Sequence, residues 1–315
     1  MIVTLAGGVG AARFLAGLVQ VRDPRTCTAI VNVADDIVLH GLAVSPDLDT
    51  VTYTLAGEID PERGWGLRGE TWQAMDSVRR YGGISWFNLG DRDLGTHLYR
   101  THRLGEGAAL SEVTAEIVRA WGLELTVLPV SDDRIETRVV LRDSDAETAA
   151  GGEVSFQEYF VKRRHGVAVS SVRFVGAAAA QPAPGVLDAI GTADLVVIAP
   201  SNPIVSIGPV LAVPGVRDAL IARRERAVAI SPIVGGAALK GPADRMLVEL
   251  GYESSVVGVA RLYRELASVL VIDHADRHLA PAVEDAGMRC VITDTIMASP
   301  DRSAALARTT IGVHE

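Results

Sequence analysis

The sequence predicts an α/β protein with a Rossmann-like, doubly wound and mainly parallel sheet that carries an inserted helical and antiparallel β region. Short apolar runs bounded by glycine, proline or aspartate recur along the chain. Several of them are hydrophobic almost throughout, which is typical of strands buried on both faces of a parallel sheet. Helical patterns lie between these runs, and this alternation favours a doubly wound sheet.

The predicted core elements follow in chain order. Strands are expected in "IVTLA", "CTAIVNV", "DLVVIAP", "RAVAISPIV", "SSVVGVA", "SVLVID" and "RCVITD". Helices are expected in "AARFLAGLVQV", "GVLDAIGTA" and "GVRDALIARR", where apolar residues recur at helical spacing. We therefore expect residues 1–50 and 177–315 to form one Rossmann-like nucleotide-binding core.

Residues 51–176 have a different pattern and form the predicted inserted region. Residues 50–122 contain amphipathic helical windows such as "TWQAMDSVRRYG" and "LSEVTAEIVRAWG". From residue 125 to residue 176 the pattern changes to alternation, and "ETRVVLRD" and "VSFQEYFVKRRH" are expected to form antiparallel strands or a hairpin. The chain is thus expected to have a split core with an insertion.

Composition limits the classes of partner. The chain has 315 residues, 48% of them hydrophobic, and a formal net charge of -9. An acidic protein does not attract nucleic acid or an anionic membrane, so neither is expected as a partner, whereas a small anionic ligand is compatible. Cys27 and Cys290 lie in apolar runs and are expected to be reduced thiols. The N-terminal "MIVTLAGG" lacks a basic segment and is too short for a signal peptide, so we expect a cytoplasmic protein.

The segment "LAGGVGAARF" contains the first predicted strand-to-helix junction. Glycines at this junction let backbone N–H groups approach an anion, and the helix dipole favours phosphate there. The segment lacks the Gly-Lys-Ser/Thr of a P-loop, and Arg13 stands where a Rossmann fingerprint has its third glycine. Phosphate binding by Gly7, Gly8 and Gly10 and a purely structural tight turn both stay open.

Four aspartates follow the second predicted strand, namely Asp35, Asp36, Asp47 and Asp49. Carboxylates at the carboxyl end of a strand can hold Mg²⁺ together with substrate phosphates. Each aspartate alone is also a common helix cap or turn former, so a structural role stays open. We expect Asp49 to be a polar loop carboxylate, and Asp49→Asn to leave the fold intact.

The segment "NLGDRDLGTHLYR" contains Asp91, Arg92, Asp93, His97 and Arg100 after a glycine turn. Its aspartates can cap a helix and a single histidine is usually structural, whereas its guanidinium groups can bind phosphate. The residues alone favour the structural role.

Two further loops place small polar groups after predicted core strands. "VIAPSNPIVSIGP" contains Ser201, Asn202 and Ser206, and "ISPIVGGAALKGPADR" contains Ser231 and Lys240. Ligands of α/β sheets bind at the carboxyl ends of the strands, and hydroxyl and amide groups there can bind a base or a phosphate. The two loops together predict a nucleotide pocket.

Taken together, these segments resemble one family, the 2-phospho-L-lactate transferases of coenzyme F-420 biosynthesis, which include the actinobacterial phosphoenolpyruvate transferases. The resemblance covers nearly the whole chain. Each segment is weak alone, but eight of them in the same order are highly specific. They are "LAGGVGAARFLAG", "VNVADD", "SPDLDTVTYTLAG", "DPERGWGLRGETW", "LGDRDLGTHLYR", "FQEYFV", "APSNPIVSIGP" and "SPIVGGAALKGPADRML".

The resemblance implies a Rossmann-like core, a requirement for Mg²⁺ and formation of a phosphodiester. In that family, the terminal ribityl hydroxyl of the deazaflavin Fo (7,8-didemethyl-8-hydroxy-5-deazariboflavin) attacks the distal phosphorus of a guanosine diphosphoester, and GMP leaves. "DPERGWGLRGETW" and "FQEYFV" look more like the actinobacterial than the archaeal versions. This favours phosphoenolpyruvate over 2-phospho-L-lactate as the transferred group, with dehydro coenzyme F-420-0 as the product. The resemblance also implies a homodimer.

The resemblance also assigns residues. Gly7, Gly8 and Gly10 would hold phosphate, and Ser201, Asn202, Ser206 and Ser231 would hold the nucleotide. Asp49 matches an aspartate on the deazaflavin and metal side, where it would bind Mg²⁺ or orient the attacking hydroxyl, with Asp35 and Asp36 as further metal ligands. Asn88, Asp91, Arg92 and His97 would join Asp49 in the deazaflavin site. Asn88 stands where archaeal members have a lysine.

Two other functions are weighed against this one. A non-catalytic regulator that binds a nucleotide sugar, similar to the gluconeogenesis factor family, would share the fold and the glycine-rich loop. "SPDLDT" together with "GDRDLGTH" favours the transferase. A nicotinamide-dependent oxidoreductase is disfavoured, because the acidic residues after the second strand belong to the "ADD" cluster.

Overall fold

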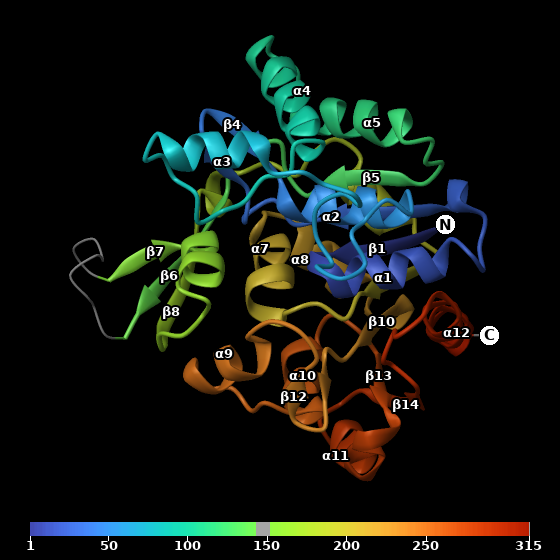
Figure 1. Ribbon diagram of the computed structural model, residues 1–315. Helices are drawn as coiled ribbons and strands as arrows, with labels where there is room; N and C mark the ends of the chain where they lie inside the picture. The colour runs from blue at the N-terminus through green and yellow to red at the C-terminus, as the bar shows by residue number, and fades with distance from the viewer. Residues whose placement is uncertain (143–151, 315) are drawn as a thin grey trace.

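The computed structural model describes residues 1–142 and 152–314. Its centre is a seven-stranded sheet with the order β14-β13-β10-β9-β1-β2-β5 (Figure 1). All neighbouring strands in this sheet are parallel, as the predicted fold class requires. The strands are β1 (Ile2–Ala6), β2 (Cys27–Val31), β5 (Thr126–Pro129), β9 (Leu195–Ile198), β10 (Ala227–Ile230), β13 (Val269–Asp273) and β14 (Arg289–Thr293).

Burial explains why these short apolar runs form the centre of the sheet. Every residue of β1, β2, β9, β10 and β13 is buried, which requires cover on both faces. The edge strands β5 and β14 are partly exposed. In the middle, Ile2 of β1 lies opposite Cys27 on one side and Leu195 on the other. The prediction of a Rossmann-like parallel core is confirmed.

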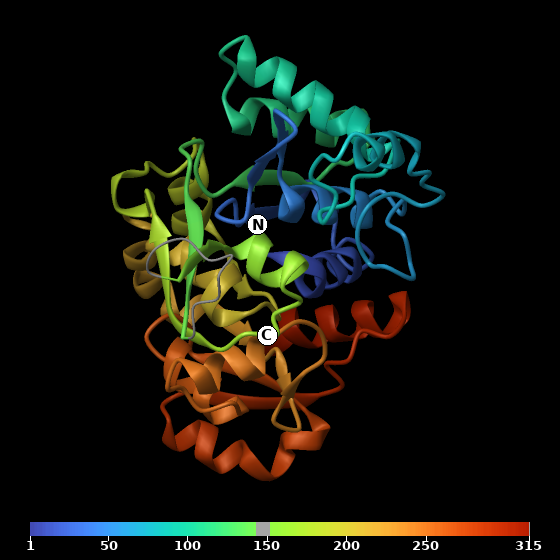
Figure 2. The same cartoon turned by 60° about the vertical axis from the view of Figure 1, so that its left-hand side comes forward.

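Helices connect the strands and cover the sheet. They are α1 (Gly8–Leu18), α2 (Pro46–Leu55), α3 (Gln73–Arg80), α4 (Asp93–Gly105), α5 (Leu110–Ala120), α6 (Val186–Thr192), α7 (Gly208–Ala212), α8 (Val216–Ala222), α9 (Ala243–Glu249), α10 (Val256–Tyr263), α11 (Ala280–Asp285) and α12 (Pro300–Ile311). Helix α1 packs against both α2 and α12. Figures 1 and 2 show α12, from the C-terminal end of the chain, beside α1. The two ends of the sequence thus cover the sheet together.

The predicted inserted region, residues 51–176, divides between the core and a separate sheet. Helices α3, α4 and α5 form its first part, in agreement with the amphipathic pattern. Strand β6 (Glu136–Leu141) pairs antiparallel with β7 (Glu153–Ser155) and β8 (Val169–Val175). Strand β5, in contrast, belongs to the main sheet, where Thr126 lies opposite Thr28 of β2. The core therefore extends into the region expected to lie outside it; residues 143–151 lie outside the described residues.

The prediction of a strand in "SSVVGVA" is wrong, because these residues begin helix α10. The Ser255 hydroxyl caps this helix by accepting hydrogen bonds from the N–H groups of Val257 and Gly258, both at 3.1 Å. A short apolar run fits a buried strand and a buried helix equally well by periodicity. "VSFQEYFVKRRH" also differs from the prediction, because only Glu153–Ser155 is a strand and a π-helical turn follows at Glu158–Lys162.

A second, smaller core holds the three-stranded sheet against the rest of the molecule. It packs Val139, Val154 and Tyr159 against Val205 and Met246, which follow β9 and β10. Two hairpins also follow core strands, β3–β4 (Ile37–Leu39 and Leu42–Val44) after β2 and β11–β12 (Ile233–Val234 and Ala237–Ala238) after β10. These additions therefore surround the carboxyl edge of the sheet, where α/β proteins bind ligands.

Within residues 1–142 and 152–314, no single helix has the length and apolar character needed to cross a membrane. One bent pair, Pro203–Ala212 with Val216–Ala222 at 95°, passes that test on length and composition alone. Cys27 and Cys290 are both free thiols, as expected.

Candidate active site

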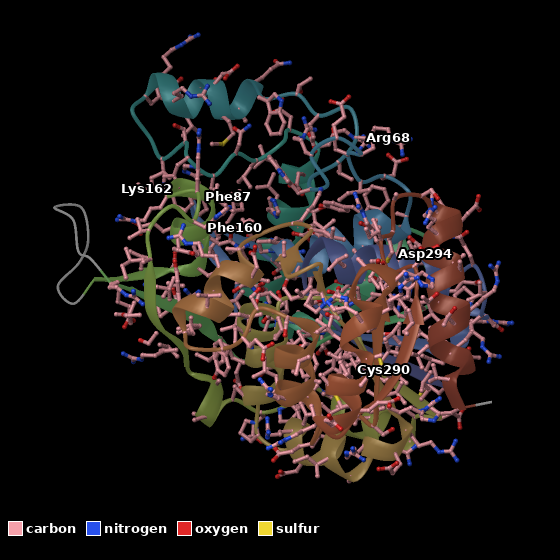
Figure 3. The ribbon with its side chains drawn as sticks, turned by 90° about the horizontal axis from the view of Figure 1, so that it is seen from below. Arg68, Phe87, Phe160, Lys162, Cys290 and Asp294 are labelled. Carbon is pink, nitrogen blue, oxygen red and sulfur yellow. The ribbon has the colours of Figure 1, made fainter. Side chains whose placement is uncertain are left out.

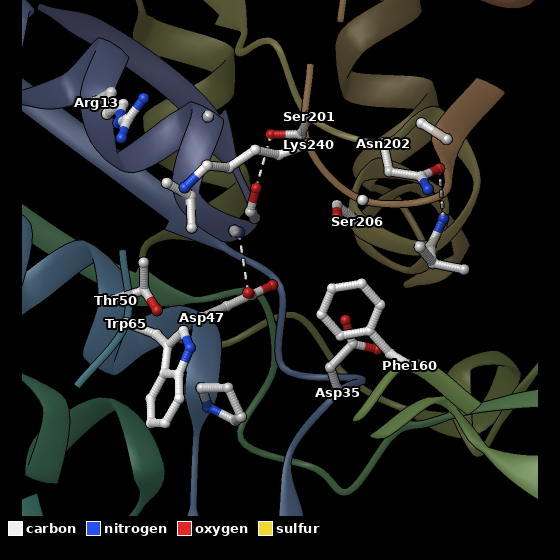
Figure 4. Close-up of a pocket in the computed structure, with 18 of the residues that line it drawn as sticks. Arg13, Asp35, Asp47, Thr50, Trp65, Phe160, Ser201, Asn202, Ser206 and Lys240 are labelled. Atoms are coloured by element: carbon white, nitrogen blue, oxygen red, sulfur yellow. Dashed lines mark hydrogen bonds between the residues drawn. The ribbon is translucent and has the colours of Figure 1, made fainter. Parts of the chain in front are cut away.

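The carboxyl edge of the main sheet opens into a cavity of about 850 Å³. The loops after β1, β2, β9, β10 and β14 line it together with the inserted region, and Figure 4 shows the part around the glycine-rich loop. Segments from both halves of the sequence thus meet in one site. The predicted site residues that line it are Gly7, Gly8, Gly10, Asp35, Asp49, Asn88, His97, Ser201, Asn202, Ser206 and Ser231.

The glycine-rich loop brings backbone N–H groups to this cavity. Gly8 begins α1 with a φ of 70°, a left-handed conformation that favours glycine. Its N–H donates to Asp47 Oδ1 at 2.9 Å (Figure 4). A carboxylate is stabilised at a helix N-terminus by the helix dipole, as a phosphate is. The Asp47 carboxylate therefore occupies the N-terminus of α1, the position where the sequence predicts a phosphate.

Gly10 has a packing role beside its place in this loop. A Cβ there would lie 2.3 Å from the carbonyl oxygen of Pro200, a backbone atom of the loop after β9. We expect Gly10→Ala to destabilise the fold by about 1–3 kcal/mol, because overpacking forces one backbone segment to move. Urea unfolding measures this effect beside Gly95→Ala, at a site on α4 with open space around it. Equal unfolding midpoints for the two variants would contradict the prediction.

Ser201 and Asn202 fix the loop after β9 against the glycine-rich loop. The Ser201 hydroxyl donates to the carbonyl oxygen of Gly7 at 2.8 Å. The side-chain carbonyl of Asn202 caps the π-helical turn Pro203–Ile207 by accepting from the N–H of Ile204 at 2.9 Å. Its amide group contacts the Met246 sulfur, a weak acceptor, at 3.9 Å. The Asn202 side-chain carbonyl is therefore already used, whereas its amide group has only this weak sulfur acceptor among the described residues.

The other two predicted nucleotide serines shape the cavity wall. Ser206 packs so closely on Gly7 that a Cβ there would lie 2.8 Å from the Ser206 Cβ. The Ser231 hydroxyl accepts from the N–H of Ile233 at 3.1 Å and also contacts the Ile233 carbonyl oxygen at 3.0 Å. Both residues thus hold the turns that lead out of β9 and β10.

Asp35 and Asp47 form a carboxylate pair beside the glycine-rich loop. Both accept a hydrogen bond from the same amide, Asn32 Nδ2, at 3.1 and 3.0 Å. Both line the cavity, and both are at least nine-tenths buried. Asp35 Oδ1 is buried without a hydrogen-bond partner among the described residues. Two converging carboxylates with an unused oxygen are a donor set that suits a hard divalent cation.

Burial governs the charge of this pair. Loss of hydration raises the pKa of Asp47 to about 6, and hydrogen bonds from Asn32 and Gly8 limit the rise. Burial, and then the neighbouring charge of Asp47, raise the pKa of Asp35 well above its usual value. A divalent cation between the carboxylates would offset both the lost hydration and the repulsion.

Asp49 lies in the first turn of α2, and not in a loop as the sequence predicts. Its Oδ2 accepts from Arg100 Nη1 at 3.2 Å, and its Oδ1 accepts from Arg100 Nη2. Arg100 on α4 is 2% exposed and Asp49 is 5% exposed, so this is a buried two-point ion pair at the edge of the cavity. The sequence predicts that Asp49→Asn leaves the fold intact. The structure corrects this expectation: the variant would leave the Arg100 charge buried without its carboxylate partner, so it should destabilise the fold.

His97 connects this ion pair to another carboxylate. Its Nδ1 lies 3.7 Å from Asp49 Oδ2, and its Nε2 lies 3.4 Å from Asp93 Oδ2. The Tyr53 hydroxyl donates to Asp93 Oδ1 at 2.6 Å. Burial alone would raise the pKa of Asp93, but His97 and Tyr53 together hold it below its usual value. Asp49, Asp93 and His97 present possible metal-ligating atoms within 4.8 Å of one another.

The structure does not bring Asp36 to the predicted metal site. Asp36 follows Asp35 in sequence, but its carboxylate accepts a hydrogen bond from Ser45 Oγ at 2.6 Å and does not line the cavity. Asp36 therefore does not join Asp35 in the cavity lining; its carboxylate instead contacts Ser45, the residue before α2.

Asp91 and Arg92 also lie outside the cavity lining. Asp91 accepts hydrogen bonds from the N–H groups of Gln73 and Ala74, both at 3.0 Å, and so caps α3. Arg92 donates to the carbonyl oxygen of Arg68. These contacts are the structural role that the residues alone favour, and they differ from the deazaflavin contacts that the resemblance implies.

Aromatic side chains line the remaining wall of the cavity. They are Trp65, Trp86, Phe87, Phe156 and Phe160. Phe156 and Phe160 stack with their ring centroids 5.5 Å apart and their planes at 11°. Figure 3 shows Phe87 and Phe160 on the same side of the molecule, away from Cys290. This wall offers flat apolar surface to a planar ring system.

Sequence reasoning assigned no site role to Tyr53, Trp65 or Phe160. The signal for Tyr53 was present, because it follows Asp49 by four residues and so shares its face of α2. Trp65 and Phe160 gave no such signal. Trp65 lies in a loop and Phe160 in a short π-helical turn, and neither segment has a regular spacing of residues that would show which side chains share a face.

Nearly the whole chain matches a known family. Residues 2–308 match the family described as 2-phospho-L-lactate transferase CofD. The chain belongs to the 2-phospho-L-lactate transferase family. Relatives of this transferase include the phosphoenolpyruvate transferase of Streptomyces griseus, 47% identical over 100% of this chain and 98% of the relative. Another is the phosphoenolpyruvate transferase of Mycolicibacterium smegmatis, 42% identical over 98% of this chain and 96% of the relative.

Solved structures similar to this transferase show the same fold. Two crystal structures of a Bacillus halodurans protein, one described as a member of the UPF0052 family, match 98% of both chains with TM-scores of 0.64 and 0.63. Their identities of 19% and 17% support the architecture and nothing finer. Membership in the family confirms a transferase of coenzyme F-420 biosynthesis, and the nucleotide-sugar-binding regulator is not favoured.

Proposed function

We propose that this transferase moves the phosphoenolpyruvate group from its guanosine diphosphoester to the deazaflavin Fo, releases GMP and forms dehydro coenzyme F-420-0. The observation that carries the proposal is the full-length match to phosphoenolpyruvate transferases at 41 to 47% identity. The 2-phospho-L-lactate group is the second candidate, because the family description names it.

In this proposal the donor lies with its diphosphate at the N-terminus of α1 and its guanosine along the loop after β9. Gly7, Gly8 and Gly10 line the cavity at this helix N-terminus, where the helix dipole favours a phosphate and where the N–H of Gly8 donates to Asp47. The available Asn202 amide faces the same cavity, and Ser206 and Ser231 complete the wall. The nucleotide would then lie at the carboxyl end of the central strands, where doubly wound sheets bind nucleotides.

Asp35 and Asp47 are the residues that best fit Mg²⁺. They supply oxygen ligands, which Mg²⁺ prefers, and one buried oxygen of Asp35 has no other partner among the described residues. The cluster of Asp49, Asp93 and His97 fits less well, because Arg100 already neutralises Asp49 and one ligand would be nitrogen. Bound Mg²⁺ supplies positive charge that stabilises the phosphates during transfer.

The acceptor lies, in this proposal, against the aromatic wall with its ribityl hydroxyl toward Asp49. Asn88 and His97 line the same part of the cavity. Asp49 accepts a hydrogen bond from the attacking hydroxyl and so orients it. Arg100 acts as a positioning residue, since it holds the Asp49 carboxylate from behind in a two-point contact.

The transfer requires alignment more than covalent help from the protein. The hydroxyl oxygen forms a bond to the distal phosphorus while the bond from that phosphorus to the bridging oxygen breaks. GMP leaves with the bonding electrons, and the hydroxyl proton passes to a carboxylate of the cavity. Reactions of this kind depend mainly on positioning and on neutralised charge.

A product assay tests the proposal. The purified protein is incubated with Fo, Mg²⁺ and a freshly made guanosine diphosphoester of phosphoenolpyruvate or of 2-phospho-L-lactate, and product masses are read. A new deazaflavin phosphodiester together with GMP is expected, and its mass names the acid. EDTA should stop the reaction. No product from either donor, together with selective binding of a uridine diphospho-sugar, would contradict the proposal.

The homodimer and the cytoplasmic location stay predictions. Light scattering in solution measures the first, with an expected mass of twice the 33.3 kDa of the chain. A monomer mass at the concentrations used in the assay would contradict it.

A further inference from the structure

Lys240 is a cavity residue that the proposed mechanism does not use. It follows the β11–β12 hairpin and lines the cavity. The chain has one other lysine, Lys162, which forms an ion pair with Glu158 at 3.6 Å. Lys240, in contrast, has no acidic partner at ion-pair distance within residues 1–142 and 152–314. An ammonium that lines a ligand cavity without a carboxylate partner is available to a bound anion.

The Lys240 ammonium lies over the first turn of α1. A Cβ on Gly64 would lie 3.1 Å from Lys240 Nζ and 3.8 Å from Val9 Cγ1. The ammonium is therefore placed between α1 and the loop that joins α2 to α3, and Figure 4 shows the side chain extending over α1. Gly64, with a φ of 74°, leaves room for it. Two segments that are distant in sequence thus meet at the mouth of the cavity.

Hydrogen bonds to the two turn residues fix the β11–β12 hairpin that precedes Lys240. The buried Asp276 accepts from the N–H of Gly235 at 2.9 Å. The Ser254 hydroxyl donates to the carbonyl oxygen of Gly236 at 3.0 Å. These hydrogen bonds therefore position the segment that contains Lys240. No ion pair of Lys240 within residues 1–142 and 152–314 contributes to this position.

The other cations at the cavity are used differently. The Arg63 guanidinium lies 5.6 and 5.0 Å from the ring centroids of Trp65 and Trp72, and it pairs with Asp60 at 2.6 Å. Arg13 is one helical turn further along α1 than Val9. Arg13 also lines the cavity and forms no ion pair within residues 1–142 and 152–314, so position distinguishes the two cations: Lys240 lies beside Gly64, in the loop that joins α2 to α3.

The charge of the donor calls for such a cation. A divalent cation held by the Asp35–Asp47 pair can contact the phosphates, but the pair and the cation together carry no net charge that would offset the charge of the donor. Its two phosphates can use the N-terminus of α1, and its three-carbon acid carries a further negative charge next to the distal phosphate. We propose that Lys240 binds this carboxylate and so selects donors that carry one. The inference rests on the proposed function and assigns a specificity residue to it.

The test compares two donors that differ in this carboxylate. One is the guanosine diphosphoester of phosphoenolpyruvate, and the other is the propyl ester of GDP, which has three carbons and no carboxylate. The wild type is expected to favour the first by about tenfold or more in kcat/KM. Lys240→Ala should lower kcat/KM for the first donor by about tenfold, mainly through KM, and leave the propyl ester unchanged. Lys240→Arg should restore part of the preference, and Lys162→Ala is the matched control with both values unchanged.

Other outcomes overturn the inference. If Lys240→Ala lowered kcat/KM equally for both donors, Lys240 would bind the diphosphate or have only a structural role. If Arg13→Ala lost the preference for the carboxylate donor and Lys240→Ala kept it, Arg13 would be the residue that binds the carboxylate. Calorimetric binding of both donors with Mg²⁺ and without Fo repeats the comparison without turnover. If the wild type transfers from neither donor, the proposed function fails, whereas the binding data still decide the role of Lys240.

Discussion

Asp35→Asn is expected to lower the transfer rate by at least about a hundredfold at saturating substrates. Asparagine keeps the shape of the side chain and can still accept from Asn32 Nδ2, but it removes one negative charge from the proposed magnesium site. The product assay measures this loss. Asp36→Asn is the matched control, because Asp36 is the neighbouring carboxylate that does not line the cavity. Equal losses in the two variants would contradict the assignment of the metal to the Asp35–Asp47 pair.

The same variant is expected to be more stable than the wild type when metal is removed. Burial raises the pKa of Asp47 to about 6 and raises the pKa of Asp35 as well. A carboxyl group with a higher pKa in the folded state contributes stability below its unfolded pKa of about 4, and this stability is lost as pH rises through the folded pKa. In EDTA we therefore expect Asp35→Asn to exceed the wild type by about 1–3 kcal/mol at pH 7.5 and to match it near pH 4.

Urea unfolding at these two pH values checks the prediction. Added Mg²⁺ should reduce the difference in unfolding free energy between the two proteins at pH 7.5, because it is expected to bind and stabilise the folded wild type and not the variant. If the wild type were more stable than Asp35→Asn at pH 7.5 in EDTA, the buried carboxylates of Asp35 and Asp47 would not destabilise the metal-free fold, and the prediction would be wrong.

Arg100→Met is expected to destabilise the fold by about 3–5 kcal/mol, because it leaves the Asp49 carboxylate buried without its partner. Unfolding in urea gives the free energy. Arg103→Met is the control on the same helix, since Arg103 is 30% exposed and pairs with Glu106 and Glu116, and we expect it to cost less than about 1 kcal/mol.

A double variant separates the two charges from the packing. Arg100→Met combined with Asp49→Leu removes both members of the ion pair, so it should be more stable than Arg100→Met alone. It should also be inactive, because it lacks the carboxylate proposed to orient the acceptor. If Arg100→Met were as stable as the wild type, the prediction would be wrong, because the buried Asp49 carboxylate would not need Arg100 as its partner.

The core was predictable from sequence because its strands are buried on both faces. Runs such as "IVTLA" and "SVLVID" are apolar throughout, and a parallel sheet flanked by helices is the arrangement that needs such strands. The same signal failed at "SSVVGVA", where burial made a helix look like a strand. It also failed at β5, because pairing with β2 is a contact across about a hundred residues that local alternation does not encode.

The site was predictable to the extent that its residues follow core strands. Gly8, Asp35 and Ser201 were found because the carboxyl ends of parallel strands meet at one edge. What each side chain contacts was not predictable. The partner of Asp49 lies 51 residues away on another helix, and Asp35 and Asp36 are neighbours in sequence that face different surroundings. These contacts depend on how α2 and α4 pack, which spacing along the chain does not specify.

The hydrogen bond from Gly8 to Asp47 has a consequence for the order in which ligands arrive. With Asp47 at its N-terminus, α1 already holds an anion, so a nucleotide that comes without a cation meets repulsion where a glycine-rich loop normally offers attraction. A cation bound by Asp35 and Asp47 would remove this repulsion and would attract the phosphate. If the proposed metal site is right, free nucleotide should bind weakly at low magnesium, and the metal and the donor should bind together.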